Sequence, residues 1–410
     1  MAAAYTSPSL ARVARGDLCA GCGACAGIAP GKVAMTVAAP GFLRPSQLAR
    51  LNAEEEAAIA AACPGLGQRV APEGRSDDVL WGPYVWMKTG HATDPDLRFA
   101  GSSGGALSRM LIHLVETGVV DAAVTNGADP DLPIGNVTVI AADPAEVAAS
   151  AGSRYAPSAP LARLAELKAD GRRFAFVGKP CDVAALRALI ARDPSLNTVF
   201  PVLLSFFCAG VPSHAGGRAV LAALGTTLED TAAFRFRGNG WPGRATARDR
   251  AGEERSMSYH DSWGQILSRH VQHRCKICAD GSGLAADIVC ADAWEADEAG
   301  YPLFDEGAGT SLIVARTAHG AALLADAETA GAIATQPFDV ATLAAIQPGQ
   351  RERRRALLAR LVARRLAGLP IPRYTGLRLA AAARQNPLSR NVKNFLGMMR
   401  RSLRSRPRTE

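Results

Sequence analysis

Four cysteines near the start of the chain have the spacing of a metal-cluster ligand set: Cys19, Cys22, Cys25 and Cys63. The first three form a Cys-x2-Cys-x2-Cys motif, and the fourth is remote and precedes Pro64. This is the ligand pattern of a 4Fe-4S cluster. A short turn can place three thiolates at three corners of a cubane, and Gly21 and Gly23 suit such a turn. We therefore predict an iron–sulfur site with all four cysteines as ligands.

A second set of four cysteines lies downstream: Cys181, Cys208, Cys275 and Cys278. Only the last two form a Cys-x2-Cys motif. Spacing alone leaves three interpretations open, because four thiolates suit a second 4Fe-4S cluster or a structural zinc ion, and the two lone cysteines could be core residues. The ninth cysteine, Cys290, follows two apolar residues, which predicts an inert thiol in a buried strand.

A glycine-rich loop over residues 99–107 has the composition of a phosphate-binding turn. It contains Ser102, Ser103, Gly104 and Gly105 and leads into a predicted helix. Glycines allow close backbone approach, hydroxyls can donate hydrogen bonds, and a helix N-terminus offers free N–H groups. The loop is neither a Walker A motif nor a true Gly-x-Gly-x-x-Gly motif, so an ordinary glycine-rich helix start remains an alternative.

Two further residues are candidates for a cofactor pocket. Tyr155 follows Ser153 and Arg154, and Lys179 lies two residues before Cys181, where it would place a cation beside a cluster or an anionic cofactor. A flavin needs apolar walls, hydrogen-bond donors for its ring and a binding place for its phosphates, which these segments could supply together. The histidines show no metal-ligand spacing, and no catalytic acid or base is assigned.

The elements that must position these residues alternate between strands and helices. Strands are predicted over 84–89, 122–125, 174–177, 202–207, 287–290 and 311–315, and helices over 105–116 and 183–191. This alternation predicts an α/β fold rather than a β-sandwich. In the N-terminal segment, residues 32–45 contain a predicted strand, residues 48–62 a predicted helix and residues 65–78 a predicted linker.

We expect four parts along the chain: a small ferredoxin-like 4Fe-4S module (1–80), a part with the glycine-rich loop (81–175), a part with the second cysteine set (176–345) and a basic helical tail (346–410). The 410 residues carry a net charge of +8, but residues 351–410 contain 17 Lys and Arg against two Glu. The main body is therefore acidic, which argues against a nucleic-acid-binding surface on it. The tail could contact an anionic membrane, a nucleic acid or an acidic protein, or be a solvated helix. We expect a membrane or protein contact rather than a nucleic acid.

Composition and the apolar pattern exclude several classes of protein. Hydrophobic residues make up 48% of the chain, so it can form a packed core and is not disordered as a whole. No apolar run approaches the length of a membrane-spanning helix, and the first residues lack the pattern of a secretory signal. We expect a cytoplasmic protein, where thiols stay reduced.

Besides the cysteine sets and the loop, several segments follow one another in the order and spacing of a known family: Gly152-Ser-Arg-Tyr155, Gly178-Lys-Pro-Cys181, Phe207-Cys208, Arg274-Cys-Lys-Ile-Cys-Ala-Asp280, Asp292-Ala-Trp294 and residues 310–317. Over about residues 15–350 the chain resembles the coenzyme F420 hydrogenase/dehydrogenase beta-subunit family. With Gly41-Phe-Leu-Arg-Pro45 and Gly240-Trp-Pro-Gly243 it is most similar to bacterial members associated with polysaccharide and pyruvyl-transferase genes.

The resemblance implies a flavin-binding α/β core with FAD and two 4Fe-4S clusters. The downstream cysteines match the family's cluster beside the flavin, and the six loop and pocket residues fall in segments that resemble its flavin pocket: Ser102, Ser103, Gly104, Gly105, Tyr155 and Lys179. The N-terminal set resembles a fused ferredoxin module. Cys290 stands where many relatives carry glycine, and the tail beyond Gln350 is not needed by the family's chemistry.

The implied activity is an oxidoreductase. Electrons would come from a one-electron donor such as ferredoxin, pass through both clusters to FAD, and reach an unidentified small-molecule acceptor. Coenzyme F420 and a polysaccharide-pathway substrate are two candidates for this acceptor. A non-catalytic electron-transfer subunit that docks through its tail is the main alternative. A structural zinc protein with a nucleic-acid-binding tail is a third interpretation.

Overall fold

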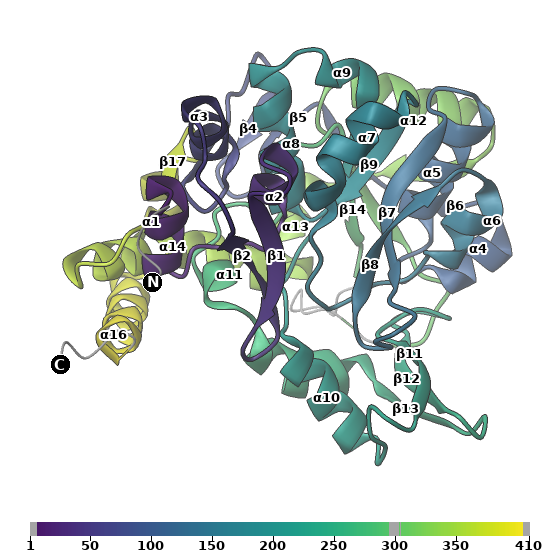
Figure 1. Cartoon of the computed structure of the whole chain (residues 1–410). Helices are drawn as coiled ribbons and strands as arrows, with labels where there is room; N and C mark the ends of the chain where they lie inside the picture. Colours follow the sequence, from purple (N-terminus) through teal and green to yellow (C-terminus); the bar gives the residue numbers. More distant parts are fainter. Residues whose placement is uncertain (1–5, 295–302, 304, 405–410) are drawn as a thin grey trace.

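The computed structural model describes residues 6–294, 303 and 305–404. Its centre is an eight-stranded mixed sheet in the order β16-β6-β15-β14-β10-β9-β7-β8 (Figure 1). Strands β14, β10, β9 and β7 are parallel neighbours, and the flanking strands are antiparallel. The strands are β6 (Trp86–Ala92), β7 (Ala122–Ala128), β8 (Asn136–Ala141), β9 (Phe174–Gly178), β10 (Val202–Phe206), β14 (Ile288–Asp292), β15 (Ser311–Ala315) and β16 (Ile333–Pro337).

Helices cover both faces of this sheet, as the buried apolar clusters show. One face carries α4 (Pro95–Ala100), α5 (Ala106–Glu116), α6 (Pro144–Ala149) and α12 (Ala318–Thr329), and the other carries the 3-10 turn η1 (Pro160–Arg163), α7 (Leu164–Asp170), α8 (Pro180–Arg192) and α9 (Leu196–Val199). Strand β9 is buried along its whole length, with Phe174 and Phe176 in one cluster and Ala175 and Val177 in the other. Successive strand residues point to opposite faces, so an all-apolar strand fits this central position. The α/β prediction is confirmed.

The N-terminal segment folds against one end of this core. It contains α1 (Pro8–Arg15), α2 (Ala24–Ile28), the antiparallel hairpin of β1 (Val33–Ala38) and β2 (Phe42–Gln47), and α3 (Ala53–Ala62). Three short strands follow: β3 (Gly67–Arg69), β4 (Ser76–Asp78) and β5 (Gly82–Tyr84). This segment carries all four cysteines of the N-terminal set.

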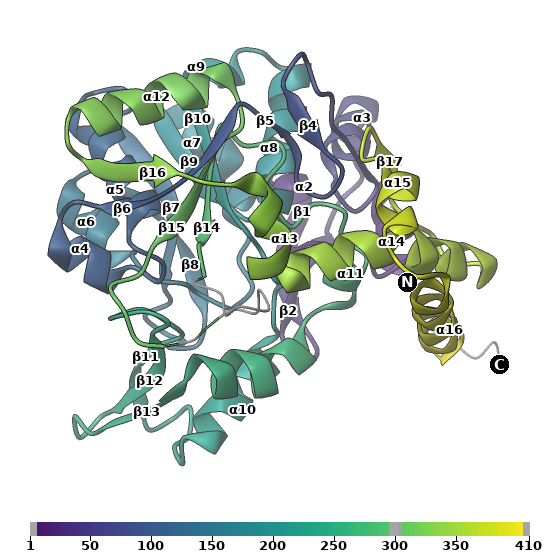
Figure 2. The same cartoon turned by 180° about the vertical axis from the view of Figure 1, so that it is seen from behind.

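A separate three-stranded sheet lies beyond the main sheet, next to α10 (His214–Ala223) (Figure 2). Its strands are β11 (Thr231–Arg235), β12 (Arg244–Asp249) and β13 (Glu254–Ser258). The turns η2 (His260–Ile266) and η3 (Leu267–His270) and helix α11 (His273–Lys276) lead back to the main sheet.

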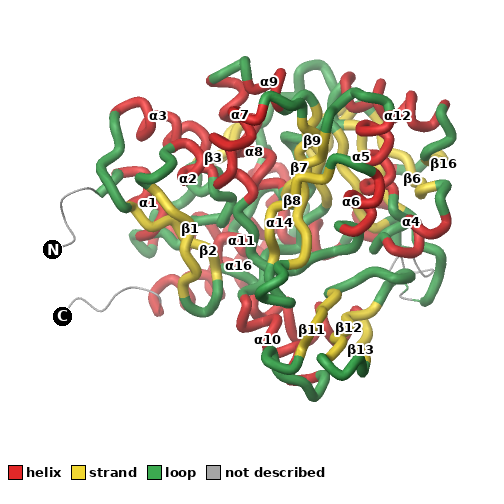
Figure 3. The backbone as a smooth tube through the Cα atoms, turned by 45° about the vertical axis from the view of Figure 1, so that its right-hand side comes forward, coloured by secondary structure: helices red, strands yellow, loops and turns green. Residues whose placement is uncertain are grey.

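The C-terminal segment consists mainly of helices: η4 (Val340–Thr342), α13 (Leu343–Ile346), α14 (Pro348–Leu366), α15 (Leu379–Arg384) and α16 (Leu388–Arg404), with the short strand β17 (Arg373–Thr375) between α14 and α15. Leu357, Leu361 and Met398 of this tail share a buried cluster with Val13 and Leu18. The described parts of both chain ends therefore lie on one side of the molecule (Figure 3). None of the described helices combines the length and apolar character needed to cross a bilayer.

Three details of the fold differ from the sequence-based predictions. The helix predicted from residue 48 begins only at Ala53, because Asn52 caps it and pairs reciprocally with Glu55 in a capping box. The predicted linker over 65–78 contains β3 and β4, which pair with β17 and β5. The sheet of β11, β12 and β13 was not predicted, because its strands are polar and half-exposed.

Candidate functional site

The four N-terminal cysteines line one small cavity of the first module. Cys25 lies in the first turn of α2, which begins after Gly23 at φ +82°. Cys63 ends α3 and so comes from a different helix. A Cβ at Gly23 would lie 2.6 Å from the backbone nitrogen of Ala162, so this turn needs glycine both for its φ and for its packing.

The thiols of this set perturb one another. Burial first and the neighbouring Cys19 second raise the pKa of Cys25 to about 12 and the pKa of Cys63 to about 11. Backbone N–H groups of Gly65 and Leu66 lower the pKa of Cys63. Buried thiols are poor anions by themselves, but a coordinated metal deprotonates a thiol. The chemistry of this donor set therefore fits a metal cluster.

The fold also brings the four downstream cysteines together. Cys181 lies in the first turn of α8, Cys208 follows β10, and Cys275 and Cys278 lie in and just after α11. Burial raises the pKa of Cys181, and the neighbouring Cys208 and Cys278 thiols raise it too. Burial first and the Cys275 and Cys278 thiols in addition raise the pKa of Cys208 to about 12. Three segments remote in sequence thus bring their thiols close enough to perturb one another's pKa values.

Neither set is arranged around a single point. In the described ranges 6–294, 303 and 305–404, no three Cys, His, Asp or Glu side chains form a group that could hold one metal ion. A cubane is ligated at four different iron atoms, so its thiolates need not converge on one centre.

A buried cation, Arg274, lies between the two cysteine sets. It lowers the pKa of Cys19 and Cys63 in the first set, and the Cys278 thiol of the second set acts on Arg274 in turn. Its guanidinium donates a hydrogen bond of 2.8 Å to the carbonyl oxygen of Pro64, next to Cys63. The two sets are therefore neighbours, and Arg274 is 2% exposed between them.

The side chain of Gln272 forms a second bridge. Its amide nitrogen donates to the carbonyl oxygen of Ala20 at 3.3 Å and to the sulfur of Cys275 at 3.5 Å. Arg44 donates to the Gln272 amide oxygen at 3.1 Å and fixes the orientation of the amide. The segment before Cys275 is thus held against the N-terminal cluster turn.

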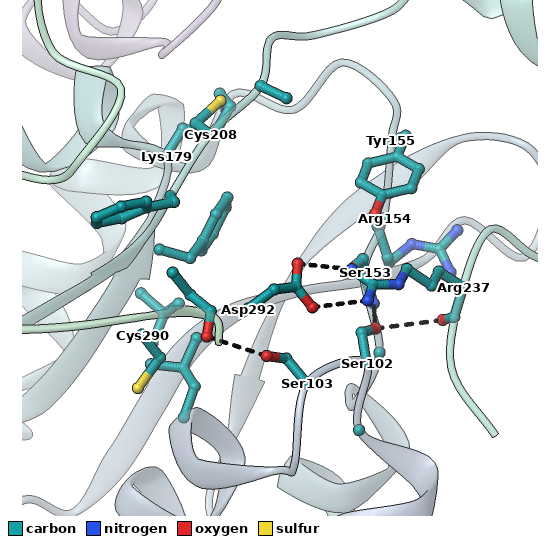
Figure 4. Close-up of a pocket in the computed structure, with 18 of the residues that line it drawn as sticks. Ser102, Ser103, Ser153, Arg154, Tyr155, Lys179, Cys208, Arg237, Cys290 and Asp292 are labelled. Atoms are coloured by element: carbon teal, nitrogen blue, oxygen red, sulfur yellow. Dashed lines mark hydrogen bonds and ion pairs between the residues drawn. The ribbon is translucent and has the colours of Figure 1, made fainter. Parts of the chain in front are cut away.

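A cavity of about 290 Å³ opens at the carboxyl ends of the parallel strands, where open α/β sheets bind ligands. This volume lies close to the lower end of the range for ligand sites, about 300 Å³. Its lining includes five of the six predicted flavin-contacting residues: Ser102, Ser103, Gly105, Tyr155 and Lys179. The sixth, Gly104, packs against Gly309 instead. Cys208 also lines this cavity, so the second cysteine set reaches its wall. Figure 4 shows Cys208 and Lys179 on one side of it and Tyr155, Arg154 and Arg237 on the other.

The glycine-rich loop ends at a helix N-terminus that faces the cavity. Gly105 is the N-cap of α5 at φ +69°, and no side chain caps this helix. Ala106, Leu107 and Ser108 of the first turn line the cavity. Their N–H groups and the helix dipole give this wall a partial positive charge, which fits a phosphate group.

The two serines of the loop bind backbone groups of the protein. The Ser103 hydroxyl donates to the carbonyl oxygen of Ala291 at 3.0 Å, and the Ser102 hydroxyl accepts from the backbone N–H of Ser153. These bonds fix the loop against β14 and against the segment that carries Tyr155. Direct contact of either hydroxyl with a phosphate stays a prediction.

The Lys179 ammonium is held by two residues, Ser158 and Asp182. Its ammonium donates to the hydroxyl and carbonyl oxygens of Ser158 at 2.7 and 3.2 Å and pairs with Asp182 at 2.7 Å. Burial alone would lower the pKa of Lys179, but Asp182 and then Cys181 outweigh burial and raise it. Lys179 therefore stays charged beside the second cysteine set.

Tyr155 belongs to an aromatic group on the other side of the cavity. Its ring lies 4.8 Å from Trp263 and 5.9 Å from Phe236, measured between ring centroids. Rings in this arrangement supply the apolar wall that a planar ring system needs.

The buried ion pair of Arg237 and Asp292 was not singled out as part of the site. The guanidinium donates two hydrogen bonds of 2.9 and 2.6 Å to the carboxylate and lies 4.5 Å from the Tyr259 ring centroid. Burial would lower the pKa of Arg237, but Asp292 outweighs burial and raises it. Asp292 stands in a segment that the sequence analysis noted, and Arg237 lies three residues before the noted segment Gly240–Gly243. Their pairing depends on the fold.

Two family models match the chain in succession. Both describe the beta subunit of coenzyme F420 hydrogenase/dehydrogenase: the model of its N-terminal part matches residues 87–166, and the model of its C-terminal part matches residues 171–341. The first contains the glycine-rich loop, and the second contains all four downstream cysteines. The N-terminal cysteine set and the basic tail lie outside both matches.

Two similar proteins agree with these matches. Coenzyme F420 hydrogenase subunit beta of Methanococcus voltae is 24% identical over 298 residues, which are 71% of this chain and 99% of that protein. A chain of the xenon-derivatized F420-reducing [NiFe] hydrogenase complex of Methanosarcina barkeri has the same fold, with a TM-score of 0.54 and 18% identity over 70% of this chain and 96% of that one. Both relatives are parts of an oxidoreductase. The chain belongs to the coenzyme F420 hydrogenase/dehydrogenase beta-subunit family.

Proposed function

We propose that this protein is an iron–sulfur flavoprotein oxidoreductase. It takes electrons from a one-electron donor such as ferredoxin, passes them through two 4Fe-4S clusters to FAD, and delivers them to an organic acceptor. Coenzyme F420, named in both relatives, and a polysaccharide-pathway substrate are the two acceptors we consider. The observation that carries the proposal is the continuity of the sites: two neighbouring sets of four thiols, with Cys208 of the second set in the wall of the cavity.

The N-terminal cluster is assigned to Cys19, Cys22, Cys25 and Cys63, and the second cluster to Cys181, Cys208, Cys275 and Cys278. When bound, clusters carry single electrons and a flavin exchanges one or two, which lets it couple a one-electron donor to a two-electron acceptor. In our assignment the chain divides into the cluster module (1–80), the loop-bearing part (81–175), the part with the second cluster (176–345) and the basic tail (346–410).

The chain's own groups have distinct tasks in this proposal. The first turn of α5 binds the flavin phosphates, and the aromatic group around Tyr155 provides apolar walls. Lys179 and Arg274 are buried cations that stabilise added negative charge at the cysteine sets. Arg237 and Asp292 hold the opposite wall rigid through their paired hydrogen bonds.

A non-catalytic electron-transfer subunit is the second candidate function. The observation that favours it is that the Methanosarcina barkeri relative is a chain of a hydrogenase complex. The two candidates share the cofactors and differ in where the acceptor is reduced.

The experiment that separates them uses the protein purified under anaerobic conditions. Reduced ferredoxin is added first, and coenzyme F420 or other organic acceptors are then added while bleaching and recovery of the visible spectrum are followed. If the protein is an oxidoreductase, reduced ferredoxin bleaches its visible spectrum, and at least one organic acceptor restores the spectrum. A protein that bleaches and recovers only with a protein acceptor is an electron-transfer subunit, and one without visible colour has no such cofactors.

A further inference from the structure

Helix α16 (Leu388–Arg404) exposes a strip of apolar side chains that the redox site does not use. Leu388, Val392, Leu396 and Leu403 are 78%, 47%, 58% and 52% exposed. At about 100° per residue these four positions fall within about 80° of one another and extend over about 22 Å. They form one continuous strip along the helix, which we call the apolar strip.

Exposed apolar side chains gather at this end of the molecule. Of the eleven large apolar residues that are exposed within the described ranges, six belong to α14 and α16, including Val362 and Leu366. Scattered exposed leucines are ordinary, but a concentration of this kind marks a contact surface.

The other side of α16 is firmly packed. Met398 is fully buried in a cluster with Leu361 and Leu18. Arg360 of α14 donates hydrogen bonds of 3.2 and 3.0 Å to the side-chain oxygen of Asn394. The helix is therefore held in one orientation, and that orientation turns the apolar strip outward.

Cations lie directly beside the strip. Lys393, Arg400 and Arg404 fall about 40–80° beyond its edge around the helix, and all three are exposed. Arg390 pairs with Glu352 at 2.9 Å, but within the described ranges Lys393, Arg400, Arg401 and Arg404 form no ion pair. Helix α16 contains no acidic residue.

We propose that α16 docks the protein on an anionic lipid surface. The apolar strip enters the boundary between headgroups and acyl chains, and the flanking Lys and Arg side chains reach the lipid phosphates. Figures 1 and 2 both show α16 projecting from one end of the molecule, away from the eight-stranded sheet. An acidic protein would account for the cations, but the full-length apolar strip beside them is the pattern of an interfacial helix.

The test measures binding of the full chain to vesicles by co-sedimentation. Vesicles of phosphatidylcholine alone are compared with vesicles that also contain phosphatidylglycerol. We expect at least about tenfold tighter binding to the anionic vesicles, weakened by added salt, because each Lys or Arg near the surface contributes to attraction.

Two double variants separate the contribution of apolar contact to vesicle binding from the contribution of charge. L388Q/L396Q removes apolar contact and K393E/R400E reverses charge, and each should weaken binding to anionic vesicles at least about tenfold. The matched control is L48Q/R50E, which makes one change of each kind at exposed residues of a loop in the N-terminal module. The control should bind as the unchanged chain does. All four positions in α16 are exposed, so cofactor content and thermal unfolding should not change.

Three results would overturn the proposal: no binding of the full chain to anionic vesicles, equal binding to both vesicle types, or full binding by the α16 variants. The first result makes an acidic protein the occupant of the strip. The test does not depend on the redox proposal, because vesicle binding is measured without an electron donor or acceptor.

Discussion

At the scale of single residues, burial and charge decide what each thiol can do. Burial raises the pKa of Cys25, Cys63 and Cys208 to between about 11 and about 12, so none of them is an anion at neutral pH without a bound metal. Cys290 is more deeply buried than these three residues, and burial alone raises its pKa to about 12. What separates Cys290 from the others is the absence, in the described residues, of a thiol that perturbs it.

This difference gives a prediction with an internal control. Cys275→Ser should remove about half of the iron and sulfide from the anaerobically purified protein, because one cluster loses a ligand. Cys290→Ala should leave both contents unchanged. The measurement is iron and acid-labile sulfide per chain, and equal losses in the two variants would contradict the assignment of ligands.

Arg274 gives a prediction about potential rather than content. A unit charge at about 8 Å in a medium of effective dielectric about 20 is worth about 2 kcal/mol, which is about 90 mV for one electron. Arg274→Gln should therefore make the reduction potentials of the clusters more negative by about 90 mV. Arg274→Lys keeps the positive charge and should change the potentials much less. A redox titration followed by electron paramagnetic resonance measures both. Unchanged potentials in Arg274→Gln would show that this cation does not act on the clusters.

At the scale of elements, strands and helices bring the functional residues to one edge of the sheet. The central strands were predictable, because β9, β10 and β15 are short, apolar and bounded by polar residues. The start of α3 could have been predicted, because Asn52 followed three residues later by Glu55 is the sequence signature of a capping box at a helix N-terminus. The sheet of β11–β13 could not be predicted, because its few buried residues form a core only together with α10, Leu267 and the remote Ile134.

The N-terminus of α5 is the element whose role is tested most simply. In Gly105→Ala a Cβ would lie 2.8 Å from the carbonyl oxygen of Leu97, so the glycine-rich loop must shift. Gly118 has nearly the same φ, +68°, but its Cβ would meet open space. Both variants carry backbone strain of about 1–2 kcal/mol, and only Gly105→Ala should lose bound flavin.

Flavin per chain after gentle purification is the readout for this pair of variants. Retention of full flavin content by Gly105→Ala would place the phosphate site elsewhere. Loss of flavin from Gly118→Ala as well would attribute the effect to general destabilisation.

At the scale of the whole molecule, the closeness of the two cysteine sets is the feature that cysteine spacing alone could not reveal. Cys181 and Cys208 lie outside any Cys-x2-Cys motif, so spacing left zinc, iron–sulfur and core packing open, and only the family resemblance joined them to Cys275 and Cys278. Packing of α8, β10 and α11 around Arg274 makes them neighbours of the N-terminal set. The basic tail was predicted as a helical appendage. In the structure it shares a core with the first module and exposes one strip of α16.

The most direct test of the account is the cofactor content of the full chain purified without oxygen. Two 4Fe-4S clusters and one flavin predict about eight iron atoms, about eight acid-labile sulfides and about one FAD per chain. A content of about four iron atoms per chain would show that only one cluster is present, so the proposed path through two clusters would be wrong. Zinc in place of iron, or the absence of flavin from a folded chain, would contradict the proposed electron path as a whole.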